Sequence, residues 1–97
     1  MRTIYKYEVR MLDYALISGR VEKFLHVDYQ KTTETICVWA TINSEAEERK
    51  FVVSCYGTGH EIPQSAGDYI GTVILYSGEV VLHYFYKEIS EAYELTE

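Results

Sequence analysis

The chain has 97 residues, of which nine are Lys or Arg and fifteen are Asp or Glu, so its formal net charge is −6. This length supports a single domain, and a hydrophobic fraction of 47% excludes an intrinsically disordered chain. The negative charge argues against nonspecific binding of duplex nucleic acid, because the phosphates would repel the protein.

The N-terminal segment alternates polar and apolar residues and carries charges throughout. It lacks the continuous apolar region of roughly 7–15 residues that a signal peptide needs, and no run reaches the roughly 20 residues of a membrane helix. We therefore expect a soluble cytosolic protein without a membrane partner. In that compartment Cys37 and Cys55, each within an apolar run, are expected to be reduced and buried.

Polar and apolar residues alternate through most of the chain, and this period of two predicts β-strands. The first strand is expected over 3–10, where Tyr5, Tyr7 and Val9 alternate with charged residues. A short segment over 14–17 follows, and further strands are expected over 21–29, 34–42, 49–56, 69–76 and 79–86. In the strand over 21–29 the alternation assigns one face to Val21, Leu25, Val27 and Tyr29.

Short polar links separate these strands. Ser77-Gly78 predicts a hairpin between the last two, and 43–48 is a polar connection whose composition also allows one helical turn. No segment is long enough for a crossover helix, so a parallel sheet is disfavoured. We expect an all-β fold, a small antiparallel sandwich or barrel of six to seven strands, as a single domain over 1–88. An acidic tail over 89–97 is expected to be a frayed end or a short helix.

Several predicted strands are apolar on both faces, most clearly the one over 79–86. Its two faces carry Val80, Leu82, Tyr84 and Tyr86 on one side and Val81, His83 and Phe85 on the other. One face fills the core, and a second copy of the chain is the natural cover for the other. We therefore expect a homo-oligomer, a dimer or a tetramer.

The segment over 56–63, Tyr-Gly-Thr-Gly-His-Glu-Ile-Pro, is the densest unusual stretch. Gly57 and Gly59 allow positive φ and close approach to a ligand, and successive N–H groups in such a turn can bind an anion. Thr58 and His60 add side-chain donors. A dinucleotide-binding fingerprint is excluded because Ile62 stands where its third glycine is needed. A plain tight loop with a solvated histidine stays open as the alternative.

No arrangement of catalytic or metal-ligating residues emerges from the sequence. Cys55 falls on the core face of its strand and is expected to be inert, and the zinc-protease spacing after His60 would need a second histidine where Gln64 stands. His26 and His83 are expected to be satisfied or surface histidines. We expect no catalytic group, no metal site and no cofactor.

Ten tyrosines make up most of the aromatic content. Those in or beside predicted strands, Tyr5, Tyr7, Tyr56, Tyr69, Tyr84 and Tyr86, suit either base stacking or a subunit interface. Basic residues recur at every fourth position of the first strand, as Arg2, Lys6 and Arg10, and share one face. Such a stripe could meet a compact anion without making the whole protein basic.

Several motifs in this order resemble a family of small phage proteins, and the resemblance covers nearly the whole chain. They are Ile4-Tyr5-Lys6-Tyr7-Glu8, Val38-Trp39-Ala40, Gly57-Thr58-Gly59-His60, Tyr69-Ile70-Gly71-Thr72 and His83-Tyr84-Phe85. One departure is Glu61, where the family more often has proline. The family is associated with phage nucleotide sponges, anti-CBASS proteins that bind a cyclic dinucleotide signal and keep it from its effector. The resemblance implies the cytoplasm of an infected bacterial host, an oligomer and a ligand such as 3′3′-cGAMP.

The sequence hypothesis is thus a binding protein for a cyclic dinucleotide, without turnover. Tyr56 and Tyr69 are the candidate stacking residues. The candidate donors are Gly57, Thr58, Gly59 and His60, and the candidate cations are Lys6 and Arg2. Two alternatives stay open: a phosphodiesterase that cleaves the same signal with His60 as general acid or base, and a phage protein-interaction module without a nucleotide ligand.

Overall fold

A computed structural model describes residues 1–89 of the chain. Seven strands form the fold: β1 (Arg2–Val9), β2 (Ala15–Gly19), β3 (Val21–Gln30), β4 (Thr35–Asn43), β5 (Arg49–Gly57), β6 (Asp68–Leu75) and β7 (Val80–Ile89). Two short 3-10 turns, η1 (Gln64–Ala66) and η2 (Tyr76–Gly78), flank β6. The expected all-β class is confirmed, with the strand over 14–17 present as β2.

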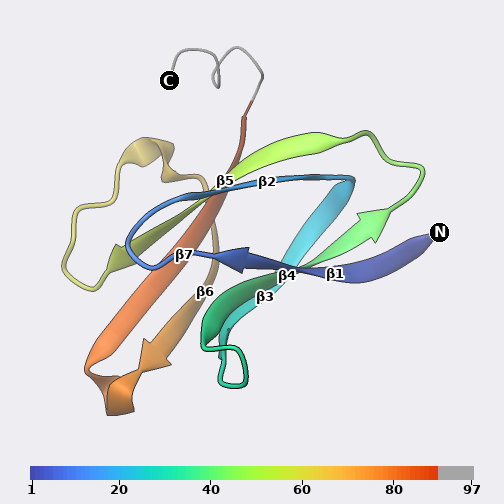
Figure 1. Ribbon diagram of the computed structural model, residues 1–97. Helices are drawn as coiled ribbons and strands as arrows, with labels where there is room; N and C mark the ends of the chain where they lie inside the picture. The colour runs from blue at the N-terminus through green and yellow to red at the C-terminus, as the bar shows by residue number, and fades with distance from the viewer. Residues whose placement is uncertain (90–97) are drawn as a thin grey trace.

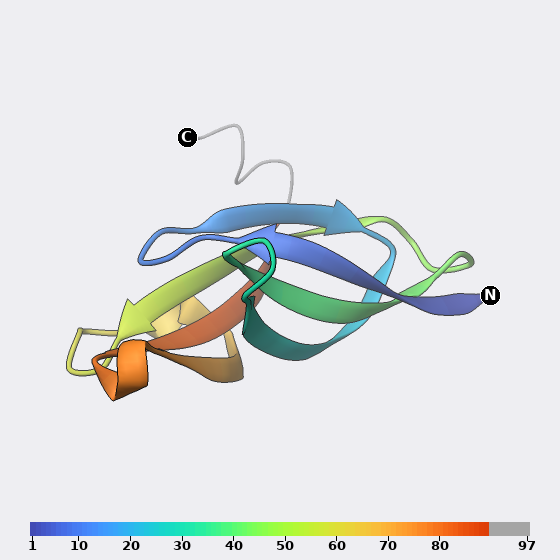
Figure 2. The ribbon, with the colours of Figure 1, turned by 60° about the horizontal axis from the view of Figure 1, so that its bottom comes forward.

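The strands form two antiparallel sheets that pack face to face. Sheet A has the order β1-β4-β3 and sheet B the order β2-β5-β7-β6. Figures 1 and 2 show the two sheets as layers, with β1 and β2 along one side of the sandwich. On the other side β3 packs against β6, and the space beside Gly71 is so tight that a Cβ there would lie 2.9 Å from a methyl carbon of Val27.

The core lies between the sheets and follows the predicted alternation. The inward residues of β4 and β7, such as Val38, Ala40 and Tyr84, are fully buried. Phe24 of sheet A meets Phe51 of sheet B edge to face, with ring centroids 5.2 Å apart. Burial of such large apolar side chains is the main force that holds the two layers together.

The predicted face of the third strand is wrong in part. Register shifts between β3 and β4 occur at Val21/Lys23 and at Phe24/His26. Each shift turns the following residues to the opposite face. Val21, Phe24 and Val27 therefore point into the core, whereas Leu25 is 42% exposed.

The connections follow the predicted pattern with one difference. Ser77-Gly78 does join β6 to β7, through a turn in which Tyr76, Ser77 and Gly78 all have positive φ. The 43–48 connection is built of turns and contains no helical segment. The N-terminus lies at one end of the molecule, and the loop after β5 and the β6–β7 turn lie at the other (Figures 1 and 2).

The C-terminal tail expected over 89–97 falls outside the described residues except for Ile89, which ends β7. Within residues 1–89 there is no helix that is long and apolar enough to cross a membrane.

Candidate functional site

The outer face of sheet B carries the candidate site. Because inward Val53, Cys55, Leu82 and Tyr84 alternate with outward neighbours, β5 and β7 present a second row of large side chains to the outside. β2 and β6 add outward apolar residues at the two edges, Leu16 at 58% and Ile74 at 64% exposure. The outward residues of the four strands are Leu16, Ser18, Lys50, Val52, Ser54, Tyr56, Tyr69, Thr72, Ile74, Val81, His83, Phe85, Lys87 and Ile89.

Three aromatic rings form a row across β5, β7 and β6. Phe85 lies between the other two, with ring centroids 5.8 Å from Tyr56 and 5.6 Å from Tyr69. Both contacts are edge-type, at interplanar angles of 70° and 64°. Tyr69 is 57% exposed, so its ring is available to a ligand. We call Tyr56, Phe85 and Tyr69 the aromatic row.

A chain of hydrogen bonds runs beside the aromatic row and centres on His83. Its Nε2 lies 2.8 Å from Oγ1 of Thr58, and its Nδ1 lies 3.0 Å from Oγ1 of Thr72. The hydroxyl of Tyr69 lies 2.5 Å from the same Thr72 oxygen. Thr58 in the loop after β5 and Thr72 of β6 are thus connected through His83 of β7.

In this chain of hydrogen bonds, one hydroxyl hydrogen has no acceptor within the chain and can be donated to a ligand. A neutral imidazole donates from one nitrogen and accepts at the other. If Nε2–H of His83 donates to Thr58, Thr72 donates to Nδ1 and Tyr69 donates to Thr72. The hydroxyl hydrogen of Thr58 then points away from this hydrogen-bond chain. If Nδ1–H donates to Thr72, the spare hydrogen is that of Tyr69. An anionic ligand beside Thr58 or beside Tyr69 would favour the histidine tautomer that directs the spare hydrogen toward it.

The Gly57–His60 segment is a tight turn at the end of β5. The amide N–H of His60 donates to the carbonyl oxygen of Gly57 at 3.0 Å, and Gly59 has φ +90°, as the third position of a type II turn requires. The amide N–H of Gly57 donates in return to Nδ1 of His60 at 3.2 Å. A histidine that accepts at Nδ1 carries its hydrogen on Nε2, so Nε2–H is a donor for a ligand.

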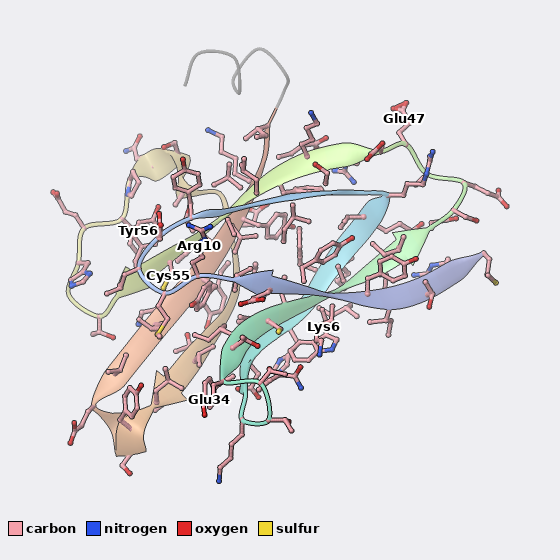
Figure 3. All side chains as sticks on the ribbon, viewed as in Figure 1. Lys6, Arg10, Glu34, Glu47, Cys55 and Tyr56 are labelled. Atoms are coloured by element: carbon pink, nitrogen blue, oxygen red, sulfur yellow. The ribbon has the colours of Figure 1, made fainter. Side chains whose placement is uncertain are left out.

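The structure brings most of the sequence-predicted site residues together. Tyr56, Tyr69, Gly57, Thr58, Gly59 and His60 lie on the outer face of sheet B or in the turn at its end. Lys6 and Arg2 lie on β1, in sheet A, and are not part of this group. Figure 3 shows Tyr56 and Lys6 in separate regions of the sandwich.

Each basic residue of the first-strand stripe has its own partner. Arg2 lies 2.8 Å from Glu22, Lys6 hydrogen-bonds Gln30, and Arg10, which follows the end of β1, lies 3.6 Å from Asp13. The hydrogen bonds from Asn43 and Arg2 hold the pKa of Glu22 below its usual value. These local pairs make the stripe a poor anion site.

Two residues of the site were not singled out from the sequence. His83 was expected to be a satisfied or surface histidine, and its two hydrogen bonds do satisfy it, but they also connect the motifs on either side of it. Phe85 completes the aromatic row. The alternation over 79–86 placed both on one face, and this was the available signal. The pairing of β7 with both β5 and β6 could not be derived from it.

A hollow of about 680 Å³ lies elsewhere, at the β1–β2 connection. Its lining includes the carboxylates of Glu8 and Asp13 and one guanidinium, that of Arg10, which pairs with Asp13. An excess of acid over base disfavours an anionic ligand there. The hollow is therefore a weaker candidate for a phosphate-bearing ligand than the outer face of sheet B.

The remaining reactive groups add no chemistry to the site. Cys37 and Cys55 are free thiols and buried, as expected. The hydroxyl of buried Tyr84 donates to the carbonyl oxygen of Arg10 at 3.0 Å, and burial raises the pKa of Tyr84. Among residues 1–89, no group of three or more His, Cys, Asp or Glu side chains is arranged to hold a metal ion.

Comparison with known proteins gives a family but not an activity. No curated protein and no solved structure matches the chain. One family matches residues 1–94, which is nearly the full length. The chain therefore belongs to the family described as a domain of unknown function, DUF7352.

Proposed function

We propose that this protein binds and sequesters a cyclic dinucleotide such as 3′3′-cGAMP on the outer face of sheet B, without cleaving it. In this role it keeps an immune signal of the host bacterium from its effector. The proposal extends the resemblance to phage nucleotide sponges and places the work in the cytoplasm of the infected cell.

The aromatic row beside the His83 chain is the observation that carries this proposal. A nucleotide needs a flat apolar surface for its base and donors for its phosphate, and here the two lie side by side. Base stacking on an aromatic side chain contributes about 1–3 kcal/mol per base. The turn itself supplies two donors, the hydroxyl of Thr58 and the Nε2–H of His60.

The same contacts favour holding the ligand over converting it. Both nitrogens of His83 are engaged by threonine hydroxyls, so neither is open to exchange a proton with the ligand. General acid–base catalysis needs a group that exchanges a proton with the substrate at a pKa near the working pH. A histidine fixed by two neutral hydroxyls serves better as an orienting group for donors.

Calorimetric titration of the purified protein with 3′3′-cGAMP tests the proposal. A sponge must bind tightly, and we expect a dissociation constant in the nanomolar range, about −12 kcal/mol. After incubation the protein is denatured and the nucleotide is chromatographed, and intact ligand should be recovered in full. Linear product would support the phosphodiesterase instead.

Variants of the aromatic row locate the site. Tyr56→Ala and Tyr69→Ala should each raise the dissociation constant roughly 5- to 150-fold, the loss of one stacking contact. Tyr5→Ala is the matched control, because Tyr5 is similarly exposed at 54% but lies on β1 of sheet A. If no cyclic dinucleotide stabilises the wild-type protein against heat, even far above micromolar concentration, the protein-interaction module becomes the better hypothesis.

A further inference from the structure

The two sides of the sandwich differ in how the edges of their sheets are protected. On one side β3 and β6 pack against each other, and the pairing of each with its neighbour contains register shifts. Such bulges keep an edge strand from pairing with another chain. On the other side lie β1 and β2, whose pairing with β4 and β5 is free of shifts (Figures 1 and 2). β2 has five residues and β1 has eight, so β1 is the long regular edge among the described strands.

The backbone of β1 presents polar groups along this edge. Among the described strands, β1 pairs only with β4. One step beyond the Arg2–Asn43 pair, the amide of Ser44 donates to the carbonyl oxygen of Met1 at 3.0 Å. The hydrogen-bonding side alternates along a strand, so the odd-numbered residues of β1 direct their backbone groups to β4. The even-numbered residues direct theirs to the open edge, and they are Arg2, Ile4, Lys6 and Glu8, all of them exposed.

The two cations of β1 do not cover this edge. Charged side chains, lysine in particular, often protect an edge strand. Here Nε of Arg2 and Nζ of Lys6 donate to side chains of β3, which lies on the far side of β4. Both cations are thus drawn across the sheet and away from the edge. Ile4 and Tyr5, beside them in the strand, are 57% and 54% exposed.

We propose that two copies of the chain join through the open edges of β1, with antiparallel strands and with Tyr5 opposite Tyr5 at the two-fold axis. This register sets Arg2 opposite Glu8 and Ile4 opposite Lys6, so every edge-facing residue meets one of the other copy. Displacement by two residues in either direction leaves an edge-facing residue unmatched. It also sets Lys6 against Lys6 or Arg2 against Lys6, which is unfavourable.

The side chains of this register fit together on the outer face of sheet A. Arg2 gives its Nε donor to Glu22, and a guanidinium has five N–H donors, so Glu8 of the second copy adds a second carboxylate to the same group. Ile4 lies opposite Lys6, whose aliphatic stem is a surface on which an apolar side chain packs. The edge of β1 is therefore complementary to itself.

The inner face of β1 gives a second contact at the two-fold axis. Tyr7 packs against the core, and Tyr5, two residues earlier, has its side chain on the same face. In this register the two Tyr5 residues form a non-hydrogen-bonded pair, the kind in which opposite side chains approach most closely. Aromatic pairs of this kind stabilise paired strands. The contact covers rings that a single copy leaves exposed.

The interface leaves the proposed ligand face open. An axis that relates antiparallel neighbours within one sheet is perpendicular to that sheet, so sheet B of both copies lies on the same side of the joined strands. The outer face of each sheet B still points away from them. The inference therefore goes beyond the proposed function and does not depend on it, and each copy of the dimer would bind its own ligand.

Analytical ultracentrifugation of the ligand-free protein over a concentration series tests the interface. The wild-type protein should form a dimer of 11.3 kDa chains. Ile4→Lys sets a lysine opposite Lys6 of the other copy on both sides of the axis and should raise the dissociation constant of the dimer roughly 10-fold or more. Ile4→Glu sets an opposite charge there and should stay dimeric. Leu25→Lys, at an exposed leucine of β3, is the control for added charge on sheet A and should also stay dimeric.

Amide hydrogen exchange followed by NMR tests the edge without a substitution. In the dimer the amides of Ile4 and Lys6 should exchange as slowly as those of Tyr5 and Tyr7, which donate toward β4. In the Ile4→Lys variant the Lys6 amide should exchange faster, while the amides of Tyr5 and Tyr7 stay protected.

The outcomes separate this inference from the proposed function. A monomer at every concentration overturns the dimer, whatever ligand it binds. A dimer whose Ile4 and Lys6 amides exchange fast overturns the β1 edge as the interface. A dimer that both Ile4→Lys and Ile4→Glu dissociate overturns the register centred on Tyr5. A dimer with the expected exchange pattern that binds no cyclic dinucleotide overturns the proposed function and supports the interface.

Discussion

The hydroxyl of Thr58 and Nε2 of His83 lie 2.8 Å apart, at the point where the turn after β5 meets β7. This contact joins the Gly-Thr-Gly-His motif to the last strand. On the other side of the ring, Thr72 joins the Tyr-Ile-Gly-Thr motif to the same histidine at 3.0 Å. Motifs that are separate in the sequence therefore form one continuous polar chain beside the aromatic row.

Interrupting the hydrogen-bond chain through His83 should weaken ligand binding without unfolding the protein. Thr72→Val keeps the shape of the side chain but removes the hydroxyl that bonds both His83 and Tyr69. A hydrogen bond contributes about 0.5–1.5 kcal/mol, so we expect a 2- to 12-fold higher dissociation constant by calorimetry. Thr72→Ser retains the hydroxyl and should bind as the wild type does. Equal affinity of the valine and serine variants would contradict a role for the chain.

His60 should matter for binding and little for folding. Its side chain is exposed and accepts a hydrogen bond from the Gly57 amide, so His60→Ala removes a ligand donor but no core packing. We expect an unchanged melting temperature and a several-fold higher dissociation constant. His26→Ala is the control, since His26 is an exposed histidine beside Trp39 on sheet A. An unchanged affinity of His60→Ala would remove the turn from the site.

Much of the fold could be predicted because alternation is a local signal. The strand β5 shows uninterrupted alternation, and its core face is as expected. In β7 the two predicted faces are present, and the one with Leu82 and Tyr84 fills the core. In β4 the alternation is interrupted, because Ile36, Cys37 and Val38 are buried in succession. The third strand fails at Leu25 because the shifts beside Val21 and Phe24 depend on pairing with β4, which no local pattern reveals. Sheet order also depends on pairing between distant strands, and local patterns do not reveal it. β2 pairs with β5 instead of its neighbour β1, and this divides the strands between two sheets.

The loop of the candidate site could be proposed from the sequence, but the residues that the fold places beside it could not. The glycine spacing pointed to Gly57–His60, and the surplus of tyrosine pointed to Tyr56 and Tyr69. His83 could not be chosen over His26 from the sequence, because both alternate with apolar residues in a strand. Tertiary pairing decides between them: β7 lies between β5 and β6, whereas β3 is the edge of the other sheet. The stripe with Lys6 and Arg2 shares one face, as expected, but that face belongs to sheet A.

Gly67 should be the least replaceable glycine of the loop after β5. It has φ 95° and ψ −144°, and an added Cβ would lie 2.0 Å from the carbonyl oxygen of Tyr86. Gly67→Ala combines strain with a backbone clash and should lower the free energy of unfolding by about 3 kcal/mol or more in urea titrations. Gly78→Ala is the matched control: its φ is also positive, at 93°, but nothing lies within 4 Å. Its cost should be about 1 kcal/mol. Equal losses would show that strain alone decides.

The pair between Arg49 and Glu88 should make stability depend on pH in the acid range. Nε and Nη2 of Arg49 donate to the two carboxylate oxygens of Glu88 at 3.1 and 2.8 Å, and these hydrogen bonds hold the pKa of Glu88 below its usual value of 4.5. A carboxylate whose pKa is lower in the folded state stabilises the fold above its unfolded pKa. That contribution is lost as the pH falls through the folded pKa. Glu88→Gln should therefore unfold at lower urea concentration than the wild type at pH 7.

The difference in urea midpoint between the wild type and Glu88→Gln should shrink as the pH falls below about 4.5, the usual pKa of glutamate. It should vanish once the wild-type carboxylate is protonated. Because both side chains are partly exposed, added salt at pH 7 should reduce the difference in the same direction. Arg49 also donates from Nη1 to the carbonyl oxygen of Val21 on β3, at 3.0 Å, and this bond connects the two sheets independently of Glu88. Glu88→Gln should for this reason keep the native fold at every pH where the wild type is folded. A difference in urea midpoint that stays constant from pH 7 to pH 3 would contradict the proposed linkage.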